Sequence, residues 1–506
     1  MGRVLAVSAL PPHSVAGGWW KRSGGRSDTR CWERSSMQML IDGQWVGAAE
    51  EIPVHDPYTN EVVDVVPKGT ASDVDRAVTA AQKGFQVNRS LSSGERGRIL
   101  RRTAELMEER QEEFALVIAR EGSKTIREAR KEVFRCTQTL RVSGEEATRI
   151  LGETISFDQQ KGSENRRGYF YRFPIGVIAA ITPFNDPLNL VAHKVGPAIA
   201  GGNGVVLKPA TVTPLSALKL AELLLEAGLP PQVLNVVTGP GSEVGASMVS
   251  DPRIRMVSFT GGVEAGLEVT RRAGLKKIGM ELGSNSPVVV LADCDFNAAV
   301  ESCVSGAFWA AGQNCIGVQR IYLQDTIYQS FLDAFVGRTL RYKVGPKLEE
   351  DCDMGPLITK SEAIRIQGWV DEALKAGATL ECGHKREGAV YWPTVLSRVG
   401  EGMKVDCEEI FGPVVSLYPI GDLEEGIRRS NAVDFGLQAA VFTSSLSSAF
   451  RAVEGLEAGA VMVNDSTDYR MDAMPFGGIK SSGLGREGIR FALQEMTEPK
   501  TVCLNL

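Results

Sequence analysis

Apolar and polar positions follow regular patterns from residue 39 onward, and their spacing predicts the first elements of the chain. Residues 39–46 hold two short apolar runs around an Asp-Gly pair, which is typical of a tight β-hairpin. Helical spacing follows over residues 71–90, 94–122 and 124–150. We therefore expect a strand pair followed by three long helices.

Residues 154–173 interrupt the helical pattern and predict a second hairpin. Its tip is polar, and its second arm is rich in aromatic residues, which favour strands. A last strand is expected near residues 499–506. These strands present β edges, and unpaired edges are usually covered in native proteins.

Beyond residue 174, continuous apolar runs alternate with helical segments. This order predicts a parallel sheet with helices on both faces, which binds ligands at the carboxyl ends of its strands. A second unit of the same kind begins near residue 286. The predicted strands are 177–181, 204–207, 233–237 and 256–259 in the first unit and 286–291, 320–323 and 439–442 in the second, and the predicted helices are 187–200, 214–227, 242–249 and 295–311.

The composition is that of an ordinary globular protein. Hydrophobic residues make up 43% and charged residues 23% of the 506 residues, a length that suits two or three domains. The net charge of −6 argues against nucleic acid or an anionic membrane as the main partner. No apolar run approaches the ~20 residues of a membrane span.

The cysteines and histidines argue against two kinds of site, a disulfide framework and a metal centre. The nine cysteines are scattered and form no Cys-x-x-Cys pair, which favours a reducing compartment such as the cytoplasm over a disulfide framework. None of the four histidines lies at ligand spacing from another, so the sequence indicates no metal site.

The first 36 residues differ from the rest of the chain. They hold six Lys or Arg against two acids and show no helical or strand period. Targeting peptides share this basic, acid-poor composition. No amphipathic arginine helix is visible, so for residues 1–36 we favour a disordered N-terminal extension, or a true start at Met37 or Met39.

Cys315 and Glu281 have the clearest chemical potential. Cys315 ends the segment Gly312-Gln313-Asn314-Cys315 and lies thirty-four positions after Glu281. A thiol can serve as an activated nucleophile and a carboxylate as a general base, and together they support covalent chemistry through a thioester. Neither residue establishes this alone, because cysteine is among the most often buried residue types.

Two glycine-rich segments are candidates for holding phosphate. The segment 239–245 misses the G-x-G-x-x-G register by one residue, and Pro240 lacks an amide hydrogen, so we interpret it as a turn between strand and helix. Thr260-Gly261-Gly262 follows a predicted strand and precedes a helix that we expect to begin at Gly266. Because helix N-termini with small residues accept anions, this is the better pyrophosphate site.

Seven motifs, in one order along the chain, resemble the aldehyde dehydrogenase superfamily over residues 39–506. Any one would be weak evidence, but together, with Glu281 and Cys315 at the family's spacing, they are strong. The motifs are Thr182-Pro183-Phe184-Asn185, Leu207-Lys208-Pro209-Ala210, Phe259-Thr260-Gly261, Glu281-Leu282-Gly283, Gly312-Gln313-Asn314-Cys315, Glu409-Ile410-Phe411-Gly412-Pro413 and Pro475-Phe476-Gly477-Gly478-Ile479-Lys480-Ser481-Ser482-Gly483.

The resemblance implies an α/β fold with a Rossmann-like parallel-sheet cofactor domain, a second α/β catalytic domain and a β-hairpin oligomerisation arm. In the family the arm bridges subunits, so a homodimer or homotetramer is expected. The implied boundaries are 37–153 and 174–283 for the NAD(P)-binding domain, 284–485 for the catalytic domain, and 154–173 and 490–506 for the arm.

The resemblance also implies roles for three catalytic residues. Cys315 would attack an aldehyde as a thiolate. The side-chain amide of Asn185 and the backbone N–H of Cys315 would stabilise the resulting oxyanion. After hydride transfer to the nicotinamide, Glu281 would deprotonate the water that hydrolyses the thioester. The implied reaction is oxidation of an aldehyde to its carboxylic acid.

The implied cofactor is NAD or NADP. Lys208 would bind the adenosine ribose, and Glu409 the nicotinamide ribose with Phe411 against it. The remaining residues implied for this site are Thr182, Phe184, Thr211, Gly261 and Gly262.

Three positions depart from common family patterns. Thr211 stands where many NAD-using relatives have a glutamate that would repel a 2′-phosphate, so NADP becomes acceptable. Gly262 replaces a common serine or threonine beside the pyrophosphate, which loses one side-chain contact. Phe184 replaces a common tryptophan, an apolar exchange that should be tolerated.

Arg470 is the first candidate for recognising the substrate. It lies in the segment 468–475, which borders the substrate tunnel in the family and is similar to the lactaldehyde and phosphonoacetaldehyde dehydrogenase branches. Arginine is a natural partner of carboxylate or phosphonate, which favours a small anionic aldehyde. Arg135 and Arg141 are further candidates, whereas Asp186 would oppose an anion if it points inward.

Two alternatives stay open at this point. Acylating relatives pass the acyl group to coenzyme A and usually lack the general-base glutamate, so the presence of Glu281 favours water. A non-catalytic scaffold on the same fold would be signalled by loss of Cys315 or Glu281, and both are present.

Overall fold

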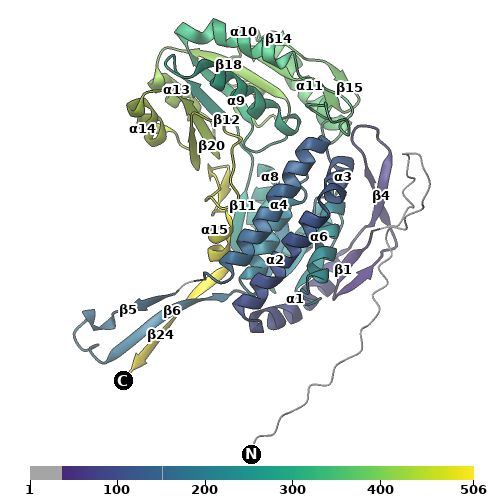
Figure 1. The fold of residues 1–506 in the computed structure, drawn as a ribbon, viewed down its shortest axis with the longest axis vertical. Coiled ribbons are helices and arrows are strands. Elements are labelled where there is room, and N and C mark those ends of the chain that lie inside the picture. Colours follow the sequence, from purple (N-terminus) through teal and green to yellow (C-terminus); the bar gives the residue numbers. More distant parts are fainter. Residues whose placement is uncertain (1–36, 151) are drawn as a thin grey trace, which may run out of the picture.

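The computed structural model describes residues 37–150 and 152–506. The predictions made for residues 1–36 lie outside the described residues. The chain forms two stacked α/β units, and a long arm projects from the lower one (Figure 1). Within the ranges described, no helix is both long and apolar enough to cross a membrane.

The lower unit is built on an eight-stranded sheet whose five central strands run parallel. Each central strand is a short apolar run because helices cover both faces of the sheet. The strand order is β2 (Gln44–Val46), β1 (Met39–Ile41), β9 (Leu234–Val236), β8 (Gly204–Lys208), β7 (Val177–Ile181), β10 (Ile254–Thr260), β11 (Lys277–Glu281) and β23 (Gly483–Leu484).

Successive residues of β7 point to opposite faces of this sheet and enter different hydrophobic cores. Ile178 belongs to the core on the face covered by α2 to α6, and Ala179 to the core under α1, α7 and α8. The helices are α1 (Ala71–Ser90), α2 (Ser93–Glu109), α3 (Gln111–Glu121), α4 (Ile126–Glu146), α5 (Asn189–Ala200), α6 (Leu215–Glu226), α7 (Ala246–Ser250) and α8 (Val263–Ala273).

The upper unit repeats this plan with a seven-stranded sheet, parallel except for β14. The strand order is β14 (Thr379–Cys382), β17 (Thr394–Ser397), β18 (Val414–Ile420), β13 (Val318–Gln324), β12 (Ser286–Val290), β20 (Gln438–Phe442) and β21 (Ala460–Val463). The helices that follow β12 along the chain are α9 (Phe296–Phe308), α10 (Tyr328–Thr339), α11 (Lys360–Lys375), α12 (Lys404–Cys407), α13 (Leu423–Ser430), α14 (Leu446–Gly455) and α15 (Ile489–Glu495). The α/β fold class is as predicted.

The arm is a three-stranded antiparallel sheet with β6 in the middle. It confirms the predicted hairpin and shows that the last strand of the chain joins it, since β24 (Thr497–Asn505) pairs along all of β6 (Arg166–Pro174). β5 (Glu153–Ile155) forms the other side. Short pairs elsewhere are β3 (Glu51–His55) with β4 (Val62–Pro67), β15 (Arg386–Glu387) with β16 (Val390–Tyr391), and β19 (Phe435–Gly436) with β22 (Ile479–Lys480).

Several predicted helix limits were wrong. The helix expected over 94–122 is two helices that break at Arg110, where the backbone leaves the helical region and α3 turns to pack against α4 and α6. The helix expected over 242–249 is a wide, π-helical turn at Gly241–Gly245 followed by the short α7. α8 begins at Val263 rather than Gly266, because the extended backbone of Gly262 caps it.

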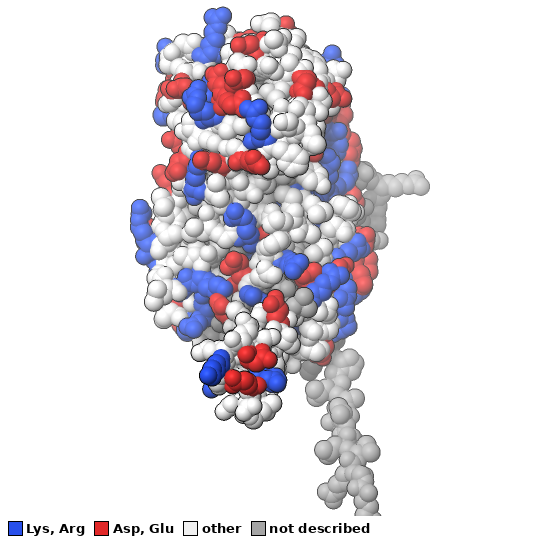
Figure 2. Space-filling view, turned by 90° about the vertical axis from the view of Figure 1, so that its left-hand side faces the viewer, with Lys and Arg blue, Asp and Glu red and all other residues white. Residues whose placement is uncertain are grey.

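Charged side chains on one side of the molecule are mixed in sign (Figure 2). Lys and Arg alternate there with Asp and Glu instead of gathering in one basic patch. A clustered basic face is the electrostatic footprint of nucleic-acid binding, and this face does not present one.

Candidate active site

The first sheet gathers most of the residues predicted for the cofactor at its switch point. The chain winds from β7 through β8 to β9 in one direction and from β10 to β11 in the other. Thr182 follows β7, Lys208 ends β8, Gly261 and Gly262 follow β10, and Glu281 ends β11. Because carboxyl ends of parallel strands share one edge, these residues lie along the same edge of the sheet, where ligands bind in folds of this kind.

Several groups at this edge of the sheet are free to bind a ligand. The buried Thr182 hydroxyl has no hydrogen-bond partner among the described residues. Gly262 caps α8, where backbone N–H groups attract phosphate, and a Cβ added there would meet no atom within 4 Å. Burial lowers the pKa of Lys208 to about 8, and its ammonium donates to the Pro209 carbonyl at 2.8 Å. These features fit a dinucleotide.

Thr211 uses its hydroxyl within the protein. The hydroxyl donates to the carbonyl of Gly239 at 3.0 Å. That hydroxyl is therefore engaged within the protein, and the position carries no charge.

Glu409 reaches the same edge from the upper unit. Its carboxylate accepts the N–H of Ser284 at 2.8 Å, and burial raises its pKa to about 7. A Cβ added at Gly283 would lie 2.4 Å from this carboxylate, so only glycine leaves room for it. Phe411 packs edge-on against Phe184 with ring centroids 5.7 Å apart, which brings the two predicted aromatic residues together.

A strained turn precedes Cys315. Ala310 (φ 51°) and Ala311 (φ 56°) both have left-handed backbone, which non-glycine residues rarely adopt. Gly312 continues the turn at φ 69°, and a Cβ there would lie 2.2 Å from the carbonyl of Gly412. Glycine is therefore required at that position.

Gln313 ties this turn to its surroundings with a fully buried amide. It donates to the Ser123 hydroxyl at 2.9 Å and accepts the N–H of Ile358 at 2.8 Å. The thiol two residues later is thus held by contacts from both units.

Cys315 and Asn185 line one cavity, as the predicted nucleophile and oxyanion donor require. Burial raises the pKa of the Cys315 thiol to about 12, and the positive charge of Arg470 opposes this rise. Among the described residues, the Asn185 side chain has no hydrogen-bond partner, so its amide is available to a ligand. The cavity is lined by Arg135, Asn185, Asp186, Leu190, Trp309, Ala310, Gln313, Asn314, Cys315, Ile316, Asp468 and Arg470.

Glu281 is a buried carboxylate with one unsatisfied oxygen among the described residues. Burial and the nearby Glu487 raise its pKa well above the usual value. Glu487 itself is paired with Lys194 at 2.7 Å. Burial opposes ionisation of Glu487, but Lys194 and Arg470 lower its pKa to about 2. The sequence reasoning missed Lys194 and Glu487, because neither carries a local signal beyond lying in a helix or loop.

Arg470 is buried at the wall of the cavity. Its guanidinium lies 3.2 Å from the Glu487 carboxylate and 3.7 Å from the ring centroid of Phe476. It also faces the imidazole of His193 at 3.5 Å. Its Nε is buried and has no partner in the part of the chain that is described.

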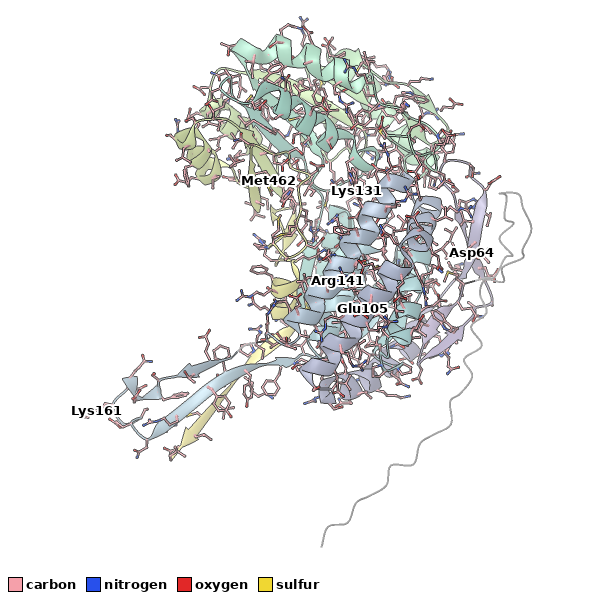
Figure 3. All side chains as sticks on the ribbon, in the orientation of Figure 1. Asp64, Glu105, Lys131, Arg141, Lys161 and Met462 are labelled. Carbon is pink, nitrogen blue, oxygen red and sulfur yellow. The ribbon has the colours of Figure 1, made fainter. Side chains whose placement is uncertain are left out.

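The other two predicted arginines differ in position. Arg135 lines the cavity but is already bound to Asp186 at 3.2 Å and Asp472 at 2.8 Å. Arg141 pairs with Glu108 on α2 and lies further along α4, away from the end that bears Lys131 (Figure 3). Asp186 does point into the cavity, and Lys124 and Arg135 both neutralise it.

Two α/β units, with a cavity that holds Cys315 between them and the buried Glu281 near enough to affect its pKa, are an arrangement typical of dinucleotide-dependent oxidoreductases. The chain belongs to the aldehyde dehydrogenase family, whose model matches residues 45–502. The predicted family is therefore confirmed.

Named relatives resemble the chain over nearly its full length. It is 49% identical over 455 residues to aspartate-semialdehyde dehydrogenase 1 of Pseudomonas canavaninivorans, a match that covers 90% of this chain and 97% of the relative. It is 44% identical over 468 residues to 3-sulfolactaldehyde dehydrogenase of Priestia aryabhattai, with 92% and 98% covered. The crystal structure of NADP-dependent glyceraldehyde-3-phosphate dehydrogenase from Bacillus halodurans, complexed with NADP, superposes with a TM-score of 0.91 at 37% identity and covers 94% of this chain and 100% of that one.

Proposed function

We propose that this protein oxidises a small anionic aldehyde to its carboxylic acid with NAD or NADP. The observation that carries the proposal is the common cavity of Cys315, Asn185 and Arg470, with Glu281 buried nearby. A nucleophile, an oxyanion donor and a cation for the substrate anion then meet in one place.

Cys315 begins the reaction. Its thiol gives its proton to solvent, and the sulfur attacks the aldehyde carbon to form a hemithioacetal oxyanion. The Asn185 amide and the backbone N–H of Cys315 donate to that oxygen. Donors fixed before the reaction are worth most where water is excluded.

The cofactor supplies the acceptor for the hydride that leaves the hemithioacetal carbon. The residues that would hold it are Lys208 at the adenosine ribose, Gly261 and Gly262 at the pyrophosphate, and Glu409 at the nicotinamide ribose. The uncharged Thr211, together with NADP in the Bacillus halodurans neighbour, supports use of NADP.

Glu281 completes the cycle. Its carboxylate takes a proton from water, and the hydroxide adds to the thioester carbon. The C–S bond then breaks, which releases the acid, and the proton held by Glu281 returns to the Cys315 thiolate. Burial and the nearby Glu487 raise the Glu281 pKa well above its usual value, which makes the ionised carboxylate a stronger base.

The charges around the cavity support an anionic substrate. Asp186 is neutralised by Lys124 and Arg135, and the buried Nε of Arg470 has no partner among the described residues. The substrates named for the three relatives, aspartate semialdehyde, 3-sulfolactaldehyde and glyceraldehyde 3-phosphate, each carry an anionic group.

The subunit assembly and the cellular compartment are further parts of the proposal. We assign the arm of β5, β6 and β24 to subunit contacts, in a homodimer or homotetramer, because the outer edges of β5 and β24 are open in the described chain. The eight cysteines of the described ranges are unpaired, which fits a reducing compartment such as the cytoplasm.

The test is turnover of purified protein with NAD or NADP and a panel of small aldehydes, followed by the absorbance of the reduced nicotinamide. Anionic aldehydes should give the highest kcat/KM, and Cys315→Ala should abolish turnover. Full turnover by Cys315→Ala would overturn the mechanism. Cys303→Ala is a matched control, because Cys303 lies on the buried face of α9 in the core of the upper unit, outside the cavity.

A further inference from the structure

Two buried glutamates one turn apart on α4 hold the two catalytic segments. Glu128 and Glu132 are four positions apart in the sequence. They therefore lie on one face of the helix, about 6 Å apart along its axis. Both are almost fully buried. Neither lines the cavity described above.

Glu128 holds the turn that precedes Cys315. One carboxylate oxygen accepts the N–H of Ala310 at 2.8 Å, and the other accepts the N–H of Thr125, its own helix cap, at 2.8 Å. Left-handed backbone at Ala310 and Ala311 costs free energy and persists only where surrounding contacts hold it. The bond from Glu128 is such a contact.

A second contact from α4 reaches the same turn. The ammonium of Lys131 lies 4.5 Å from the ring centroid of Trp309. Lys131 is found toward the end of α4 nearest the upper unit (Figure 3). The helix therefore touches two successive residues of this turn.

Glu132 holds the segment that follows Asn185. One carboxylate oxygen accepts the N–H groups of Leu188 and Asn189, at 2.8 and 3.0 Å, in the first turn of α5. The other accepts the ammonium of Lys124 at 2.7 Å, and Lys124 also binds Asp186, next to Asn185. A carboxylate with several N–H donors makes strong, short bonds.

We propose that Glu128 and Glu132 are positioning residues that together set the separation of Cys315 from Asn185. One rigid helix carries both anchors, so the nucleophile and the oxyanion donor keep one spacing although they belong to different units. The proposal rests on the roles proposed above for Cys315 and Asn185. Misplacement of reacting groups by about 1 Å can cost roughly a hundredfold in rate.

The two anchors predict different defects. Glu128 variants should slow both turnover and alkylation of Cys315 by iodoacetamide, because the thiol itself moves. Glu132 variants should slow turnover but leave alkylation unchanged, because displacement of iodide develops no oxyanion for Asn185 to stabilise. Loosening of the whole structure would instead speed alkylation, because it exposes the buried thiol, while turnover falls.

The experiment measures kcat, cofactor KM and the alkylation rate for Glu128→Ala, Glu128→Gln, Glu132→Ala and Glu132→Gln, with the alkylated site mapped to Cys315 by peptide mass. Each Ala variant should lose roughly tenfold or more in kcat with cofactor KM unchanged. The Gln variants should keep part of the kcat that the Ala variants lose, since an amide oxygen still accepts a hydrogen bond from one N–H. Glu145→Ala is the matched control, because Glu145 is exposed on the same helix and pairs with Arg149.

The proposal is overturned if Glu128→Gln and Glu128→Ala keep the wild-type alkylation rate, or if Glu132 variants lose alkylation as much as turnover. Should an Ala variant fail to fold, the Gln variant carries the same comparison. Failure of the proposed function has a different signature, because wild type would then turn over no aldehyde or Cys315→Ala would remain active.

Discussion

The guanidinium of Arg470 lies 3.2 Å from the carboxylate of Glu487 in the wall of the Cys315 cavity. This pair fixes the arginine but leaves its Nε without a partner in the described chain. Arg470 thus both pairs with Glu487 and lines the cavity.

Arg470→Ala should lower kcat/KM for anionic aldehydes more than for neutral aldehydes of the same size. A hydrogen bond to a charged group contributes about 1.5–3 kcal/mol, so the selective loss should be roughly tenfold to a hundredfold. The measurement is kcat/KM on matched substrate pairs. Arg141→Ala, which removes an exposed pair with Glu108, is the control. Equal losses on both substrates would remove Arg470 from substrate recognition.

Glu281→Gln should stop steady-state turnover but keep one burst of reduced cofactor per active site. The thioester still forms, because Cys315 is intact, but water is no longer activated. Mass spectrometry should find the acyl group on Cys315. Unchanged steady-state turnover would place water activation elsewhere, and a need for coenzyme A in the wild type would favour the acylating alternative.

Alkylation of Cys315 in cofactor-free protein should rise with pH across the neutral and alkaline range without a plateau. The reactive form is the thiolate, and burial raises the thiol pKa to about 12, so the thiol stays mostly protonated below that pH. Arg470→Ala should slow alkylation at each pH, since the arginine charge lowers this pKa. A plateau near neutral pH would show that the thiolate is already formed.

Thr211→Glu should weaken the binding of NADP and leave the binding of NAD nearly unchanged. A carboxylate at this position would repel a 2′-phosphate, and two like charges about 4 Å apart near a protein surface interact by about 4 kcal/mol before screening. We expect the KM for NADP to rise at least about tenfold. Thr211→Gln has a similar size without the charge and serves as the control. Equal effects on both cofactors would mean that Thr211 acts through its bond to Gly239.

Arg320→Leu should destabilise the upper unit strongly. Arg320 is fully buried and donates to the Asn285 side chain at 2.7 Å, the Tyr322 hydroxyl at 2.8 Å and the Ser430 carbonyl at 3.1 Å. Leucine would leave these acceptors unpaired, at a cost of about 3 kcal/mol in the free energy of unfolding. The check is the denaturation midpoint. Arg338→Ala, at a more exposed pair with Glu301, should shift it little.

Much of the fold was predictable because its signals are local. The buried strand at 177–181 is a continuous apolar run, and the turn at 42–43 is an Asp-Gly pair with positive φ at both residues. The break at Arg110 was not predictable, because helical spacing continues through it and only the packing of α3 against α4 and α6 requires the turn.

The sequence by itself indicated the family and the buried strands of the first sheet, and it singled out Cys315 and Glu281 as candidates, since these depend on residue type and spacing along the chain. The tertiary structure alone decided which polar groups meet. Glu128 binds the N–H of Ala310 across 182 positions, and Arg135 binds Asp472 across 337. The physical reason is that a buried carboxylate is stable only where donors converge on it, and that convergence leaves no pattern in the residues beside it.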